Sequence, residues 1–84
     1  MMNDYMKWIA EEEERIAQLE KEWEELAREF TQSMLNAKTK EERKQIRDRY
    51  LCREESIELA QQRCVYRIHN HKKSMLMDEL IENM

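Results

Sequence analysis

The sequence lacks glycine and proline entirely across its 84 residues. Proline is the residue that the interior of an α-helix tolerates least, and glycine is the next least favourable. Nothing in the chain therefore forces a helix to end, and long helices are the structure that this composition favours. Aromatic residues make up only 7% of the chain, whereas charged and apolar residues each make up 40%, which is typical of long amphipathic helices.

Long hydrophobic runs are also missing. No window approaches the length of a membrane span, and the first residues have neither a basic start nor an apolar stretch, so we expect no transmembrane helix and no signal peptide. The two cysteines, Cys52 and Cys64, are twelve residues apart, which is about 18 Å along one helix and too far for a disulfide. We therefore expect reduced thiols and a cytoplasmic location.

The first half of the chain carries apolar residues at intervals of seven. They are Ile9, Ile16, Trp23, Phe30 and Ala37. Leu19 and Leu26 each lie three residues after a member of this series, which is the spacing of a coiled-coil seam. Glu12 falls at the same seam position but belongs to an acidic run, so we expect it to be solvated near the helix start, where negative charge suits the helix dipole.

The strongest turn signal lies near the middle of the chain. Asn36 tolerates the left-handed conformation that ends helices, and Thr39 with Glu42 has the spacing of a capping box for a following helix. At the other end, Asn3 or Asp4 can cap the start of a first helix. In this single domain (1–84), the predicted segments are a helix over 3–35, a turn over 36–39 and a helix over 40–68 or longer.

Folding the chain near residue 38 brings apolar residues of the two halves together. The resulting pairs are Phe30 with Ile46, Leu26 with Tyr50, Leu19 with Ile57, Ile16 with Ala60, and Ile9 with Ile68. The charges also match, because four basic and ten acidic residues give the first 37 residues −6, whereas eleven basic and nine acidic residues give the rest +2. We therefore predict an all-α fold, an antiparallel two-helix coiled-coil hairpin with an apolar C-terminal extension.

Two arrangements are open for the end of the chain. The polar run over 69–74 can break the second helix, in which case Ser74 caps a short third helical segment over 74–84. Alternatively, the second helix continues and projects past the first, which is long enough to cover it only as far as about Met75.

The second helix carries apolar residues on two opposite sides. One side faces the first helix and consists of Ile46, Tyr50, Ile57, Cys64, Ile68 and Met75. The other side and the C-terminal segment supply the candidate protein-binding residues Cys52, Leu59, Tyr66, Leu76, Met77, Leu80, Ile81 and Met84. A helix that is apolar on two sides is covered on both, and exposed apolar patches mark interfaces. We expect the cover to be a second copy in a four-helix bundle, another protein, or a folded-back tail.

The sequence gives little support for a metal-binding or catalytic site. Cys52, Cys64, His69 and His71 are of metal-ligand types, but helical spacing does not bring them together as a tetrahedral site requires. Exposed carboxylates on a narrow hairpin have no dry pocket that would shift their pKa values. We therefore expect no metal, no cofactor, no catalytic residues and no enzymatic activity.

Nucleic-acid binding is an alternative. Seven of the sixteen residues from Lys38 to Arg53 are basic, and the start of the second helix supplies the candidate contacts Lys40, Arg43, Lys44 and Arg47. Acidic neighbours and a pI near 5.3 weigh against it. A further alternative is that the first helix imitates the phosphate backbone of a nucleic acid and occupies the basic groove of a partner. Its candidate residues are Glu20, Glu22, Glu24, Glu25 and Glu29.

The function that the sequence favours is a non-enzymatic protein–protein interaction module. Such a module is an adaptor, an assembly factor or an inhibitor of a larger protein. We expect it to act through the second apolar face of the second helix, as a homodimer that does not bind membranes.

Overall fold

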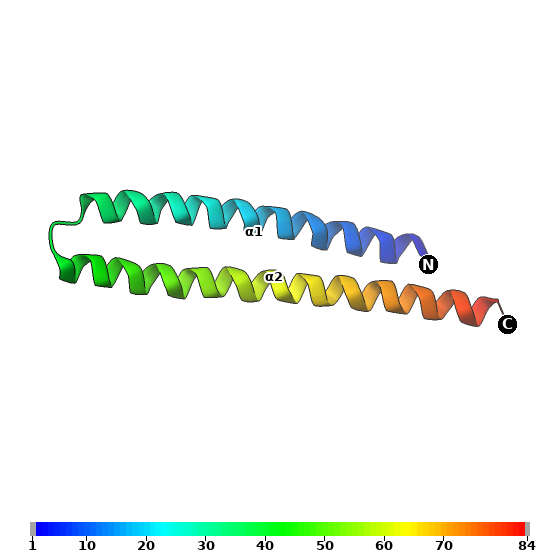
Figure 1. Cartoon of the computed structure of the whole chain (residues 1–84). Helices are drawn as coiled ribbons and strands as arrows, with labels where there is room; N and C mark the ends of the chain where they lie inside the picture. Colours follow the sequence, from blue (N-terminus) through cyan, green and yellow to red (C-terminus); the bar gives the residue numbers. More distant parts are fainter. Residues whose placement is uncertain (1, 84) are drawn as a thin grey trace.

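The computed structural model describes residues 2–83, with side chains from Asp4 to Asn83. It consists of two α-helices, α1 (Met2–Asn36) and α2 (Lys40–Glu82), joined by three residues. The helices run antiparallel and side by side, so that both chain ends lie at the same end of the rod (Figure 1). The Cα trace measures 69 × 15 × 10 Å. The predicted all-α hairpin is confirmed.

The turn contains the predicted cap in a modified form. Thr39 has an extended backbone, and its hydroxyl accepts a hydrogen bond from the backbone N–H of Glu42 at 3.1 Å. The carboxylate of Glu42 does not return this bond to Thr39, as a capping box requires. It instead accepts the backbone N–H of Lys38 at 2.9 Å, one residue earlier. The side chain of Glu42 therefore ties the connecting segment itself to the start of α2.

The ends of α1 differ from the prediction. The helix begins at Met2, earlier than the predicted caps Asn3 and Asp4. At its other end, Asn36 does not take the left-handed conformation, because no described residue has a positive φ. The last turn tightens instead, and the N–H of Ala37 approaches the carbonyl of Met34 at 3.4 Å. A tightened turn satisfies terminal carbonyls without the steric cost of a left-handed residue.

The core is a narrow seam between the helices. Among the described side chains, four apolar ones are buried, namely Ile9, Leu19, Leu26 and Cys64. Cys64 is completely enclosed, at 0% exposure, which confirms the predicted inner face of α2. Near the turn, the Phe30 ring packs 4.4 Å from the Tyr50 ring, between centroids. Phe30 lines one cleft with its predicted partner Ile46 and also packs against Tyr50, one turn further along α2.

The helix α2 continues without a break through 69–74 to Glu82, so the third helix does not form. Two contacts hold this region against the start of α1. The Trp8 ring packs 5.3 Å from the His71 ring, and the Tyr5 hydroxyl donates to the Asp78 carboxylate at 2.8 Å. Contact with α1 thus reaches about one turn past the predicted limit at Met75. The unbroken helix also excludes a folded-back tail within the described residues.

Neither helix, over the described residues, has a stretch that is long and apolar enough to span a membrane.

Replacing Thr39 by alanine tests the cap. Because the variant leaves the N–H of Glu42 without its acceptor, we expect the free energy of unfolding to fall by about 1 kcal/mol. The measurement is urea unfolding followed by circular dichroism at a fixed protein concentration. Thr31→Ala is the matched control, since the Thr31 hydroxyl only bonds the Ala27 carbonyl within an exposed turn of α1. Equal effects of the two variants would contradict the assigned cap.

Candidate protein-binding surface on the second helix

The side of α2 that points away from α1 carries a nearly continuous set of exposed residues. We call this set the outer face: Leu51, Cys52, Glu55, Leu59, Gln62, Tyr66, Lys73, Leu76, Met77, Leu80 and Ile81. It includes every predicted protein-binding residue except Met84, which lies outside the described residues. The most exposed apolar members are Tyr66 at 66%, Leu80 at 60% and Ile81 at 68%. The helical period places these residues together, because nothing interrupts α2 along its length.

The exposed apolar surface is large relative to the core. On α2 alone, eight large apolar side chains are exposed, which is twice the number of buried apolar side chains described in the whole hairpin. The total accessible surface is 7055 Å², against about 5,400 Å² for a compact monomer of this mass. A hairpin of this shape cannot cover its own outer face, since α1 occupies only the opposite side.

Two shallow hollows flank the middle of the outer face. The larger, of about 650 Å³, is lined by Trp23, Glu58, Gln61, Gln62, Val65, Tyr66 and His69. The smaller, of about 380 Å³, is lined by Leu59, Gln62, Arg63, Tyr66 and Arg67. Because both hollows share Gln62 and Tyr66, the Tyr66 side chain forms a ridge between them. A ridge beside a hollow is a shape that can interlock with a partner.

Glu55 and Lys73 are the two charged residues near the middle line of the outer face, and Glu58, Arg63 and His69 are exposed along its edges. Glu55 and Lys73 are both exposed and stand eighteen residues apart, which is five helical turns. They consequently point to the same side of α2. Lys73 occupies the position in the seven-residue column of Leu59, Tyr66 and Leu80 at which an apolar residue is missing.

A charged cluster on the opposite side of α2 escaped the sequence analysis. Arg67 donates two hydrogen bonds to Glu12 of α1, from Nε at 2.6 Å and from Nη2 at 3.1 Å. Arg67 Nη2 also lies 3.4 Å from the sulfur of the buried Cys64. The expectation that Glu12 is solvated was wrong, because its side chain is only 18% exposed and binds across the helix pair.

The cluster shifts the titration of its members. Hydrogen bonds from Arg67 lower the pKa of Glu12 and outweigh the opposing effect of burial. Burial, followed by the nearby carboxylate, raises the pKa of the Cys64 thiol. The cysteine is therefore kept protonated and unreactive. The sequence does contain one sign of this cluster. Glu12 is an acidic residue at a seam position of α1, and the antiparallel fold brings it near the basic Arg67 of α2.

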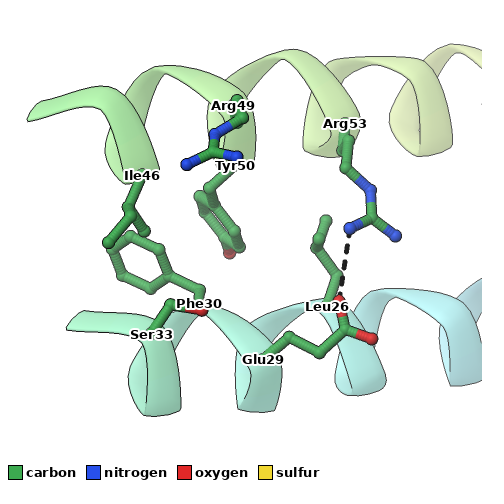
Figure 2. Close-up of a pocket in the computed structure, with 8 residues that line it drawn as sticks. All are labelled: Leu26, Glu29, Phe30, Ser33, Ile46, Arg49, Tyr50 and Arg53. Atoms are coloured by element: carbon green, nitrogen blue, oxygen red, sulfur yellow. Dashed lines mark hydrogen bonds and ion pairs between the residues drawn. The ribbon is translucent and has the colours of Figure 1, made fainter. Parts of the chain in front are cut away.

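A small cleft lies near the turn, between α1 and α2. Its volume is about 170 Å³, and Figure 2 shows the side chains that line it: Leu26, Glu29, Phe30, Ser33, Ile46, Arg49, Tyr50 and Arg53. Ser33 stands at a seam position, where a larger residue would fill the space. An ion pair between Arg53 and Glu29, 3.2 Å long, crosses the helices at its edge. The cleft is large enough for one small apolar group.

The residues of the alternative functions are exposed but partly neutralised. The candidate nucleic-acid contacts Lys40, Arg43, Lys44 and Arg47 lie on the first two turns of α2, at spacings that give one stripe. Arg47 is paired with its neighbour Asp48 at 3.1 Å. The five glutamates of the proposed mimic on α1 are also exposed, and Glu29 among them is paired with Arg53.

The metal-ligand types do not converge. Cys52 is exposed on the outer face, Cys64 is buried in the seam, and His71 packs against Trp8. No group of three or more such side chains within the described part of the chain could hold a metal ion.

Comparisons of the chain with known protein families, with curated proteins and with solved structures give no match.

Replacing Glu12 by glutamine tests the ion pair. Since its folded-state pKa is lowered, its contribution to stability is complete above the ordinary glutamate pKa of about 4.3 and is lost as the pH falls through the lowered value. We expect Glu12→Gln to reduce the free energy of unfolding at pH 7 and to flatten its decline below pH ~4.3. Unfolding curves at a series of pH values measure both effects. The exposed neighbour gives the control Glu13→Gln, and a control with the same pH profile as Glu12→Gln would contradict the assignment.

Proposed function

We propose that this protein is a non-enzymatic protein–protein interaction module that binds its partner through the outer face of α2. The observation that carries this proposal is the exposure of Leu59, Tyr66, Met77 and Leu80 along one side of an unbroken helix. Monomeric soluble proteins rarely expose contiguous apolar surface on this scale, and such surface marks interaction sites. Burial of these side chains against a partner would supply the binding free energy.

The causes of the pKa shifts also fit a binding protein better than an enzyme. Hydrogen bonds are the first cause of the pKa shifts of Glu12, Arg67, Tyr5 and Tyr50. For the first three the hydrogen bond joins α1 to α2 and so holds the hairpin together, whereas the pKa of Tyr50 is raised by Glu54 of the same helix. The hollows beside Tyr66 are open to solvent and are lined mainly by apolar and amide groups, which suits contact with another protein.

The outer face favours a partner with a helix or a groove of matching length. It extends from Leu51 to Ile81, about 45 Å along the helix axis. Apolar residues recur along it at intervals of seven, which is the arrangement that packs against another helix. An adaptor, an assembly factor or an inhibitor that works by occupying a helical surface needs no further chemistry.

Site-specific photo-cross-linking tests this function. A photoreactive amino acid at position 59 is introduced into the full-length protein, which is irradiated in the cells that naturally produce it. We expect a discrete covalent adduct of higher mass, because Leu59 lies in the middle of the outer face and is 46% exposed.

The matched control places the same group at position 35. Leu35 is also an exposed leucine, at 72%, but it lies on α1, away from the outer face. The proposal is supported by an adduct from position 59 that is absent from position 35. It is contradicted if position 59 gives no adduct, or if both positions give the same adducts.

A further inference from the structure

We infer that the partner on the outer face is a second copy of this chain, with the two α2 helices antiparallel and a two-fold axis level with Cys64. This inference rests on the proposed function, since it uses the same surface, and it adds the identity and the register of the partner. In this arrangement, residues that lie equally far before and after Cys64 in the sequence face each other across the axis.

In this register, opposite charges on the outer faces of the two copies meet. Glu55 lies nine residues before Cys64 and Lys73 lies nine residues after it. Because the two residues point to the same side of α2, Glu55 of each copy meets Lys73 of the other. The pairing occurs twice, once on either side of the axis. It also explains why a lysine stands in an otherwise apolar column.

Four apolar residues meet one another in the same register, whereas Leu59 comes level with His69 and Leu80 with Asp48 of the other copy. Leu51 and Cys52 lie thirteen and twelve residues before Cys64, and Leu76 and Met77 lie twelve and thirteen residues after it. These two pairs of neighbours therefore meet beyond the charged pairs and cover each other. On either side of the axis, the interface then contains a charge pair and, further from the axis, an apolar contact.

The larger hollow lies beside the middle of the interface, between α2 and Trp23 of α1. Its lining residues on α2 run from Glu58 to His69, which places Cys64 near their centre. Gln62 and Tyr66 lie two residues before and after Cys64, so the Tyr66 ring of one copy comes level with Gln62 of the other. A 66% exposed tyrosine next to a hollow of about 650 Å³ is the side chain available to fill it.

Other alignments fit less well. Parallel α2 helices related by a two-fold axis would bring Glu55 against Glu55 and Lys73 against Lys73, and like charges that face each other are destabilising. An antiparallel pair centred on Tyr66 would place Lys73 against Leu59 and leave its charge without a partner. The small core also requires cover, because four buried apolar side chains are few for a stable domain of this size.

Charge reversal tests the register through the dimer dissociation constant, measured by analytical ultracentrifugation. Glu55→Lys and Lys73→Glu each replace two attractive contacts per dimer by two repulsive ones, and we expect each to raise Kd about tenfold or more. The double variant Glu55→Lys/Lys73→Glu restores opposite charges across the axis, so its Kd should return close to that of the parent protein.

The matched control reverses two exposed charges on α1, in Lys21→Glu and Glu24→Lys, and should leave Kd unchanged. Circular dichroism establishes that each variant keeps its helices. The inference is overturned if the parent protein is a monomer, if the single variants dimerise like the parent, or if the double variant is weaker than both single variants.

Disulfide trapping provides a second measurement that does not depend on charge. In the antiparallel pair, the two native Cys52 residues are about 36 Å apart. Cys52 of one copy lies within one residue of the level of Met77 of the other, and the two positions point to the same side of α2. Mild oxidation should therefore leave the parent protein unlinked and convert Met77→Cys to a covalent dimer. Cys52→Ser/Met77→Cys is the control and should stay unlinked. Linking of the parent protein through Cys52 would indicate parallel helices and would overturn the inference.

The two proposals fail in different ways. A monomeric parent protein, together with a cross-link from position 59 to a different protein, overturns the second copy and leaves the interaction function standing. Absence of any adduct from position 59 overturns both.

Discussion

The ion pair between Glu12 and Arg67, together with the three-residue turn, sets the alignment of α1 against α2, on which the other contacts depend. Apolar residues that repeat every seven positions pack almost as well after a slip of one repeat, so they do not define a unique alignment by themselves. A slip of seven residues would bring Ala60 or Ser74 opposite Glu12 and leave a half-buried carboxylate without its cation. The cost of such an unpaired charge exceeds the gain from a surface pair, which makes the ion pair a device for specificity.

The sequence predicted the hairpin, its turn near Thr39 and the inner face around Cys64, because capping residues and apolar periodicity act locally. It failed where the outcome depends on contacts between distant residues. Glu12 looked like a mismatch, since its partner Arg67 follows 55 positions later. The continuity of α2 through 69–74 was also undecided, because the packing of Trp8 on His71 cannot be read from that segment. The candidate binding residues that the structure describes are exposed on one side of α2, because exposure follows from periodicity, whereas their binding to a partner is a proposal.

The two helices differ in the residues that they bury and expose. The helix α1 supplies the buried residues Ile9, Leu19 and Leu26 and turns a charged surface outward. The helix α2 contributes one fully buried residue and displays most of the exposed apolar surface. The contacts that stabilise the hairpin and the surface that we propose for binding therefore lie on opposite sides of α2. A substitution on the outer face changes exposed side chains and leaves the buried side chains Ile9, Leu19, Leu26 and Cys64 in place.

In the proposed dimer around Cys64, the basic stripe at the start of α2 would acquire a new geometry. Its first residues, Lys40 and Arg43, extend past the point at which the other copy's α2 ends. Each tip of the four-helix rod in this proposed dimer would therefore present the same cluster of positive charge, with the two clusters about 60 Å apart. A polyanionic surface could then bind both tips of the same dimer. Weak attraction at a single cluster would be strengthened by avidity.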